Sequence, residues 1–511
     1  MLQVIFVTLL SFFVLPGSLI ADAASQAAGI GGDMAATQNL GSVPTAFLVI
    51  ISTIFACSVY ALRKQSVHER ENYLLAYTNR LTNLPNFGWF EYEIPSIIRK
   101  YSLEREAGKL FIVKMKSQRL ESLKSTYDRD SIVKGIVELT KKLREENSWI
   151  RELSISSEMS QLYLLCCLPD GMTHEEAGMK IVSDGDAMHV GSYSFRMKYS
   201  AGIAKVPSNG DFDIVDLMNA ADTARVAATD KKETVGIYNE EIRKKKLLQK
   251  SIENLAPKAL ANGEFKVWLQ PKYDILRQQT VGAEALVRWQ SPELGFLMPV
   301  SFIGLFEKNG FIIELDYYML EQAFKIQQER LAAGMRVVPI SVNQSGLHSS
   351  ESGYLQRMRT IADKYGLPKG SIDLEITETV FVDFETKESR ESTVRAVDEL
   401  RNMGFTVSMD DFCTGYSSIA MLQNLSVDVM KIDRAMLVAA EESERGRRLL
   451  REVIRMGKSM DMQVLCEGIE KREHEALLIE NGCTYGQGFY FKKPAPAEEF
   501  FRILDSFGGT R

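Results

Sequence analysis

The chain has 511 residues and a net charge of −6, with 61 Lys and Arg against 67 Asp and Glu. This length exceeds one ordinary domain and predicts two large cores or three smaller units. The mildly acidic composition argues against a nucleic-acid binder, and it excludes low-complexity disorder and collagen-like repeats. Charge is unevenly distributed, because residues 1–62 contain no Lys or Arg and only two acids.

Two apolar stretches lie in this uncharged region. Residues 43–62 are long enough to cross a bilayer as a helix, and basic residues follow at once, which marks the cytoplasmic side. We therefore expect a transmembrane helix there, with a buried core helix as the alternative. Residues 4–20 are shorter, and they are either a cleaved signal peptide or a first transmembrane helix. Residues 21–42 would then form a short outside loop, which makes residues 1–71 a membrane anchor.

Residues 72–240 mix helical and strand patterns and predict an α+β or α/β domain. Its expected strands and helices are 110–115, 161–167, 193–203, 131–146 and 214–228. Cys166 and Cys167 fall in an apolar strand and are expected to be core residues. The six cysteines form no CxxC pair, and no two His have metal-ligand spacing, which argues against a zinc site. Residues 241–259 carry apolar residues at helical spacing, so we interpret them as a linking helix.

Residues 260–511 have a regular pattern in which helical segments separate most of the strands. The eight expected strands are 265–270, 281–289, 337–343, 372–377, 406–411, 427–432, 463–468 and 485–491. Eight strands alternating with helices over about 250 residues predict a (β/α)₈ TIM-like barrel. An open doubly wound sheet is the alternative, but no Gly-rich phosphate loop supports it.

Polar residues recur where these strands end. They are Asn343, Glu375, Asp410, Asp411, Lys431, Glu467 and Gln487, and Glu284 adds another acid. Strand ends of a barrel converge on the face where active sites lie. So many carboxylates would repel one another without cations, and oxygen ligands select hard ions such as Mg²⁺ or Mn²⁺. A two-metal site suited to phosphodiester hydrolysis is therefore predicted.

The run Glu284-Ala285-Leu286 resembles the signature of the EAL domain, the family of cyclic di-GMP phosphodiesterases. An ordered set of further motifs extends the resemblance over about 250–507: LQP at 269–271, SVNQSGL at 341–347, LEITET at 374–379, MDDFCTGYSS at 409–418, KID at 431–433, CEGIE at 466–470 and YGQGFYF at 485–491. The set as a whole is highly specific, whereas the three-letter match alone would not be. The implied reaction is hydrolysis of cyclic di-GMP to the linear dinucleotide pGpG.

The resemblance also implies roles for individual positions. One metal ion would be held by Glu284, Asn343, Glu375 and Asp410, and the second by Asp410, Asp411 and Glu467. Lys431 would orient the attacking water, Glu467 would be the general base, and Glu378 would steady the loop after Asp411. Contacts to the substrate or the metal shell would come from Gln270, Arg288 and Gln487. One departure is Cys413, where the family usually has Gly, and it could strain this loop and reduce activity. Such loops couple metal binding to dimerisation, so a homodimer through the EAL domain is expected.

Residues of about 75–240 resemble the GGDEF domain, the diguanylate cyclase fold. The entry motif RLTNLPNFGWF at 80–90 fits, but Ser157-Glu158-Met159-Ser160-Gln161 stands where the catalytic Gly-Gly-Asp-Glu-Phe is expected. Lys114 and Lys116 also stand where metal-binding acids are expected. Cyclase activity is therefore expected to be absent. This degenerate domain would bind a nucleotide, bind a partner protein, or only space the barrel from the membrane.

These features predict a phosphodiesterase at the bacterial inner membrane, with both domains in the cytoplasm. The alternatives are a non-catalytic receptor for cyclic di-GMP and a membrane signalling scaffold. The scaffold explains none of the acidic residues. No nucleic-acid partner is expected.

Overall fold

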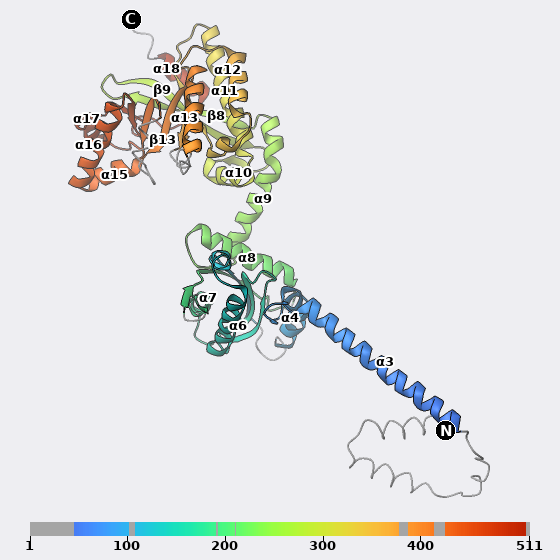
Figure 1. The fold of residues 1–511 in the computed structure, drawn as a ribbon. Coiled ribbons are helices and arrows are strands. Elements are labelled where there is room, and N and C mark those ends of the chain that lie inside the picture. The colour runs from blue at the N-terminus through green and yellow to red at the C-terminus, as the bar shows by residue number, and fades with distance from the viewer. Residues whose placement is uncertain are drawn as a thin grey trace, which may run out of the picture. The chain divides into compact units, whose positions relative to one another are not determined.

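The structure is a computed structural model, and it describes residues 45–101, 108–190, 193–209, 211–377, 387–412 and 425–506. The chain divides into two compact units, with the boundary between Ile242 and Arg243. Each unit is described by itself below (Figure 1). The predicted segments 4–20 and 21–42 lie outside the described residues.

The N-terminal unit begins with a long helix, α3, from Thr45 to Tyr77. Residues 45–62 of the predicted span form the first half of this helix. Among the described residues we find no helix whose length and hydropathy would let it cross a bilayer.

A five-stranded sheet forms the centre of the N-terminal unit. Its strand order is β2-β3-β1-β6-β7, and only the β6–β7 pair is parallel. The strands are β1 (Leu110–Ser117), β2 (Ile150–Ile155), β3 (Gln161–Cys167), β6 (Tyr199–Lys205) and β7 (Val235–Ile237). A separate hairpin consists of β4 (Ala187–Val190) and β5 (Tyr193–Arg196). The single strand predicted at 193–203 is therefore wrong. The extended conformation is interrupted at Lys198, whose φ is 48°, and the segments before and after it, β5 and β6, belong to different sheets.

Helices cover both faces of the five-stranded sheet, so this unit has three layers. The helices are α4 (Phe87–Tyr101), α5 (Leu120–Lys124), α6 (Arg129–Glu146), α7 (His174–Gly185) and α8 (Ile214–Asp230). Side chains of α6 and α7 pack with Phe111 and Val113 on one face, while α4 and α8 pack with Leu110 and Ile112 on the other. Alternation along β1 thus places apolar residues on both faces. Cys166 and Cys167 are buried on opposite faces, which confirms their expected core role.

The C-terminal unit follows the helix α9 (Glu240–Ala261) and is built on a closed barrel. Its elements are β8 (Phe265–Asp274), β9 (Gln279–Ser291), β10 (Gly295–Leu297), η2 (Pro299–Ser301), α10 (Ile303–Asn309), α11 (Ile312–Ala332), β11 (Ile340–Gln344), η3 (Gly346–Ser350), α12 (Tyr354–Tyr365), β12 (Ile372–Thr377), α13 (Lys387–Asn402), β13 (Thr406–Phe412), β14 (Val429–Ile432), α15 (Arg434–Glu442), α16 (Glu444–Ser459), β15 (Gln463–Cys466), α17 (Arg472–Glu480), β16 (Tyr485–Gly486), β17 (Ala495–Pro496) and α18 (Ala497–Ser506).

Eight of the described strands close the barrel in the order β8-β9-β11-β12-β13-β14-β15-β16, and β16 pairs with β8. The barrel prediction is confirmed, but the regular (β/α)₈ pattern is wrong at its first strand. β8 is antiparallel to both β9 and β16, whereas the other barrel strands are parallel. Only residues 275–278 connect β8 to β9, which is enough for a hairpin but too short for a helical crossover.

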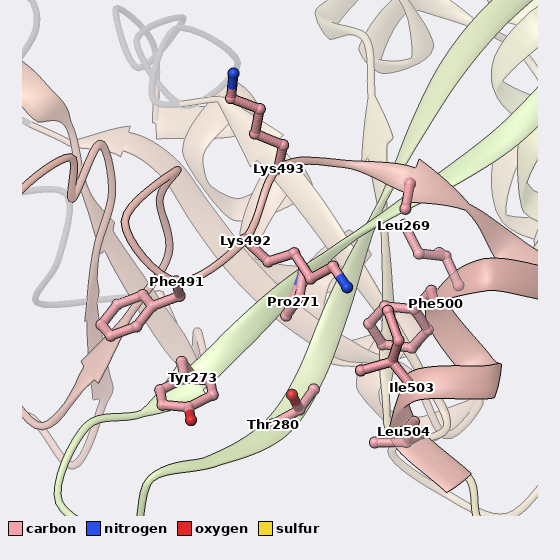
Figure 2. Close-up of a pocket in the computed structure, with 11 residues that line it drawn as sticks. Leu269, Pro271, Tyr273, Thr280, Phe491, Lys492, Lys493, Phe500, Ile503 and Leu504 are labelled. Atoms are coloured by element: carbon pink, nitrogen blue, oxygen red, sulfur yellow. The ribbon is translucent and has the colours of Figure 1, made fainter. Parts of the chain in front are cut away.

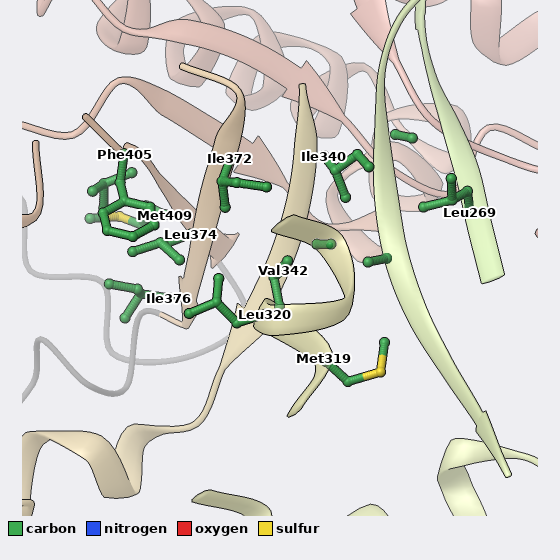
Figure 3. Packing of buried hydrophobic residues seen from close by; sticks show 14 of the residues in the cluster. Leu269, Met319, Leu320, Ile340, Val342, Ile372, Leu374, Ile376, Phe405 and Met409 are labelled. Atoms are coloured by element: carbon green, nitrogen blue, oxygen red, sulfur yellow. The ribbon is translucent and has the colours of Figure 1, made fainter. Parts of the chain in front are cut away.

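Alternation along the barrel strands separates an apolar outer face from a polar inner face. Ile372, Leu374 and Ile376 of β12 belong to the apolar cluster that packs with helix residues such as Leu320 (Figure 3). Because successive side chains on a strand point to opposite faces, the residues between them, Asp373 and Glu375, point into the barrel. The same alternation holds in β11, β13 and β14, so the interior receives the polar residues of the sequence pattern.

Candidate active site in the barrel

The predicted acids and amides come together at one end of the barrel interior. Strand register places Gln270 opposite Glu284, Asn343 opposite Glu375, and Thr377 opposite Asp410. Register between neighbouring strands thus places these residues at the same level of the barrel. The predicted residues brought together by direct contacts or by strand register are Gln270, Glu284, Asn343, Glu375, Asp410, Asp411, Lys431, Glu467 and Gln487.

A β-bulge brings the two adjacent aspartates to the same site. In a regular strand Asp410 and Asp411 would point to opposite faces. The β13–β14 register shifts between Met409 and Phe412, and Asp411 adopts a left-handed backbone with φ of 54°. Asp tolerates this conformation better than most residues. Carboxylate oxygens of Asp410, Asp411 and Glu467 consequently lie within 4.8 Å of one another.

Lys431 is the central cation of the site. Its side chain is 1% exposed, and its Nζ lies 2.7 Å from Glu375 Oε2, 2.7 Å from Glu467 Oε1 and 3.0 Å from Asp410 Oδ1. Burial alone would favour the neutral amine, but the surrounding carboxylates raise the pKa of Lys431 well above its usual value. The ammonium therefore stays charged and holds three acids from different strands together.

Two amides fix the orientation of Glu284. Asn343 Nδ2 donates to Glu284 Oε1 at 2.9 Å, and Gln487 Nε2 donates to Glu284 Oε2 at 2.5 Å. Gln487 Nε2 also donates to Gln270 Oε1 at 3.2 Å. Within the described residues, the buried Gln487 Oε1 has no hydrogen-bond partner. This buried acceptor is therefore available to a bound group or a water molecule.

The pKa values show how crowded the acids are. Burial, together with the nearby Asp410, Glu284 and Glu375, raises the pKa of Glu467 to about 8, although Lys431 opposes the shift. Burial is also the main cause of the raised pKa values of Glu284 and Asp411. The exception is Glu375, where burial opposes ionisation but two lysines lower the pKa to about 2.

This arrangement fits divalent metal ions. The candidate ligands are all oxygen donors, which hard cations prefer. Five carboxylates, those of Glu284, Glu375, Asp410, Asp411 and Glu467, surround the site, and the charge of Lys431 is shared among them. Bound cations would remove the repulsion that raises these pKa values. The donor set does not distinguish Mg²⁺ from Mn²⁺.

The remaining predicted residues are placed differently. Arg288 is buried on the same face of β9 as Glu284, where its Nη1 donates to its neighbour's carbonyl, Val287 O, at 2.8 Å. Its guanidinium also lies 5.4 Å from the centre of the Trp268 ring. Burial lowers the pKa of Arg288, and the nearby charge of Glu284 opposes this shift. Glu378 and Cys413 lie outside the described residues.

The structure adds a polar layer beneath the site that the sequence analysis did not identify. It consists of Lys272 on β8, Ser341 on β11, Asp373 on β12 and Ser408 on β13, all of them buried. Lys272 reaches the site itself, since its Nζ lies 2.7 Å from Glu375 Oε1. A signal was available in the sequence, because the latter three residues each precede a predicted ligand by two positions and so share its face of the strand.

Two pockets with mainly apolar linings lie in the C-terminal unit. One pocket of about 210 Å³ lies on the outer wall of the barrel, where Leu269, Pro271 and Tyr273 line it together with Phe491 and residues of α18 (Figure 2). Another, of about 240 Å³, includes Asn343 and Thr377 in its lining and so adjoins the site.

In the N-terminal unit, the predicted departures from the cyclase signature lie around the β2–β3 turn. Lys124 Nζ donates to Glu158 O at 2.8 Å, and a pocket of about 350 Å³ adjoins this turn. Lys114 is 3.2 Å from Asp222, so its charge is already paired. Lys116 is exposed.

Comparisons with known proteins concern mainly the barrel. Residues 253–494, slightly under half of the chain, match the EAL domain family. The cyclic di-GMP phosphodiesterase NbdA of Pseudomonas aeruginosa is 30% identical over 314 residues, covering 60% of this chain and 39% of that protein. The cyclic di-GMP phosphodiesterase PdeR of Escherichia coli is 28% identical over 304 residues, covering 59% and 45%. The chain therefore spans less than half the length of these two relatives.

One solved structure resembles more of the chain. It is described as Vibrio cholerae LapD S helix-GGDEF-EAL bound to c-di-GMP, and it covers 84% of this chain and 99% of that one, with a TM-score of 0.51. At 15% identity this likeness concerns the fold alone. The family match and the ordered acids of the barrel agree in their placement along the sequence. Residues 253–494 of this chain are therefore similar to the EAL domain family both in sequence and in the order of these acids.

Proposed function

We propose that the chain is a metal-dependent phosphodiesterase that hydrolyses cyclic di-GMP to pGpG. The observation that carries the proposal is the cluster of Asp410, Asp411 and Glu467 around Lys431, inside a segment that matches the EAL domain family. Relatives named cyclic di-GMP phosphodiesterases support the choice of substrate.

Two divalent cations, when bound, would activate a water molecule and neutralise charge on the scissile phosphodiester. Glu284, Asn343, Glu375 and Asp410 would hold one ion, and Asp410, Asp411 and Glu467 the other. Lys431 keeps these carboxylates in place through its three contacts. Because it remains protonated, it would donate a hydrogen bond to the attacking water once bound cations engage the carboxylates of Asp410 and Glu467 and release one of its three N–H groups.

The other site residues would accept a proton from water or contact the substrate. Glu467 would accept the proton of the attacking water, since bound cations would neutralise the neighbouring acids and keep its carboxylate ionised. Gln487 Oε1, which has no partner among the described residues, can accept a hydrogen bond from substrate or water. Arg288 and Gln270 would contact the substrate, and Glu378 would steady the loop after Asp411.

The experiment uses the full chain in detergent with cyclic di-GMP and Mg²⁺, with pGpG measured by chromatography. The control is Glu284→Gln, which keeps the size of the side chain but removes its charge. We expect pGpG from the wild type at a rate at least about 100-fold above the control. Equal and negligible rates would overturn the hydrolase proposal. Retained binding of cyclic di-GMP without hydrolysis would then favour the alternative, a non-catalytic receptor.

A further variant addresses the loop that follows Asp411. Cys413 stands where the family usually has Gly, and it could strain the loop. Cys413→Gly is therefore expected to raise the rate of pGpG formation, and Cys413→Ala serves as its control. An unchanged rate in Cys413→Gly would contradict the strain argument.

For residues 72–240 we propose a degenerate GGDEF-like domain without cyclase activity, which regulates the barrel or binds a partner. The three-layer fold and the likeness to the LapD structure support this proposal, as does the absence of the Gly-Gly-Asp-Glu-Phe sequence from the β2–β3 turn. Incubation of the full chain with GTP and Mg²⁺ should yield no cyclic di-GMP. Titration with GTP up to millimolar concentration would decide whether the domain binds a nucleotide.

We also propose that residues 1–71 anchor the chain in the bacterial inner membrane, with both domains in the cytoplasm. The support is the uncharged stretch 43–62 followed by Arg63 and Lys64. The chain should stay with membranes after an alkaline carbonate wash, and recovery in the soluble fraction would contradict the anchor. A homodimer through the EAL domain is a further proposal, and light scattering in detergent would test it.

A further inference from the structure

Lys272 occupies an unusual position inside the barrel. It lies on β8 between Pro271 and Tyr273, whose side chains line the outer pocket (Figure 2). Alternation therefore turns the Lys272 side chain inward, where it is only 9% exposed. A buried ammonium is costly unless it is fully paired, so its partners define what it does there.

All three hydrogens of the ammonium have partners. Lys272 Nζ donates to Ser341 Oγ in a very short contact, to Asp373 Oδ2 at 3.1 Å and to Glu375 Oε1 at 2.7 Å. An ammonium has three donors and no more, so these contacts saturate it. The direction from Lys272 to Glu375 is therefore fixed by the other two bonds.

The partners of Lys272 in the polar layer are themselves fixed by hydrogen bonds. Ser341 Oγ donates to Asp373 Oδ2 at 2.6 Å, and Ser408 Oγ donates to Asp373 Oδ1 at 2.7 Å. Both oxygens of Asp373 thus have partners from neighbouring strands. A network satisfied at every member is rigid, whereas a partly satisfied one is not.

Glu375 is consequently held from two sides. Lys272 binds Oε1 and Lys431 binds Oε2, each at 2.7 Å. Two cations at opposite oxygens fix the plane of the carboxylate. Lys431 also contacts Asp410 and Glu467, so Oε2 is the oxygen on the side of the acid cluster, whereas Lys272 ties Oε1 to the layer of Ser341 and Asp373.

We propose that Lys272 is a positioning residue, which makes Glu375 a single-oxygen ligand to a divalent cation at the site. Charge compensation of Asp373 is the competing explanation for Lys272. This inference rests on the proposed function insofar as it concerns turnover, but the effect on cation binding does not require turnover.

The test compares two variants of the full chain in detergent. Asp373→Asn keeps the contact between Lys272 and Glu375. The double variant Lys272→Met with Asp373→Asn removes this contact and has the same net charge as the wild type. We expect the double variant to bind Mg²⁺ at least about tenfold more weakly than Asp373→Asn, by calorimetric titration. We also expect its kcat to fall by on the order of 100-fold with KM within threefold, as for a misplaced group.

Equal or tighter Mg²⁺ binding in a folded double variant would overturn the proposal, because loss of a nearby positive charge without a positioning role predicts tighter binding than in Asp373→Asn. If the wild type shows no turnover but the two variants still differ in Mg²⁺ affinity, the proposed hydrolysis is wrong and this inference stands. If the double variant does not fold, a crystal structure of the wild-type chain with Mn²⁺ would show which oxygens of Glu375 bind the metal. Glu375 Oε1 on Lys272 and Oε2 alone on the metal would support the proposal, and both oxygens on the metal would overturn it.

Discussion

Replacement of Lys431 by Met is the most informative test of how the barrel tolerates its acids. Met has similar length but no charge, so Glu375, Asp410 and Glu467 would lose their shared cation. Removing one partner of a buried ionic group typically destabilises a protein by about 3–5 kcal/mol. At roughly 2–4 °C per kcal/mol for a domain of this size, the barrel should melt about 6–20 °C lower in EDTA.

Mg²⁺ should partly reverse this loss. A ligand at 100 times its dissociation constant stabilises the folded state by about 2.7 kcal/mol. The variant site carries one more net negative charge, so Mg²⁺ should raise its melting temperature more than that of the wild type. The variant is nevertheless expected to lose activity, because the attacking water would no longer be oriented.

Differential scanning calorimetry of the full chain, with EDTA and then with Mg²⁺, measures both effects. The transition that Mg²⁺ shifts in the wild type identifies the barrel. Lys364→Met is the control, since Lys364 pairs with Glu321 at the surface and its loss should move the barrel transition by less than about 2 °C. A Lys431→Met barrel that melts within about 2 °C of the wild type in EDTA would refute this account of the site.

Three other predictions concern the same barrel. In EDTA the melting temperature of the barrel should fall as pH rises from about 5 to 8. The pKa of Glu467 in the folded state, about 8, lies above its ordinary value of 4.5, so the folded state binds more protons in that window. Glu467→Gln should flatten this dependence of melting temperature on pH, and an unchanged dependence would contradict the raised pKa of Glu467. Asp410→Asn should abolish most of the thermal stabilisation by Mg²⁺, and full stabilisation in this variant would exclude Asp410 as a ligand. Gly446→Ala should destabilise the barrel by about 1–3 kcal/mol in chemical unfolding, because the new Cβ would lie 2.0 Å from Ala439 O, whereas Gly304→Ala, with nothing within 4 Å, should not.

The sequence predicted much of the barrel because its strands alternate strongly. Seven of the eight barrel strands pair in parallel with a neighbouring strand, as a (β/α)₈ barrel requires. The direction of β8 was not predictable from periodicity, which is the same in parallel and antiparallel strands. The length of the connection to β9 decides it, and the strand boundaries that fix this length are the least certain part of a sequence reading.

The site shows the same division. Motif order was enough to collect the acids and Lys431, but not to find Lys272, because a lysine after a proline in a strand usually suggests a solvated position. The second polar layer was hidden for a related reason. Ser341 and Ser408 are common residues whose meaning depends on what lies across the barrel from them.

The sequence by itself determined which strands carry polar residues, and it determined that their ends would converge once the barrel closed. Those properties follow from alternation and from motif order, which are local. Only the tertiary structure decided that Asp410 and Asp411 point into one site, because the bulge in β13 depends on its register with β14. It also decided that Lys272 contacts Glu375, since these residues are 103 positions apart and meet only when the barrel closes. Contacts between distant strands are set by packing and register, and no single segment of the chain encodes them.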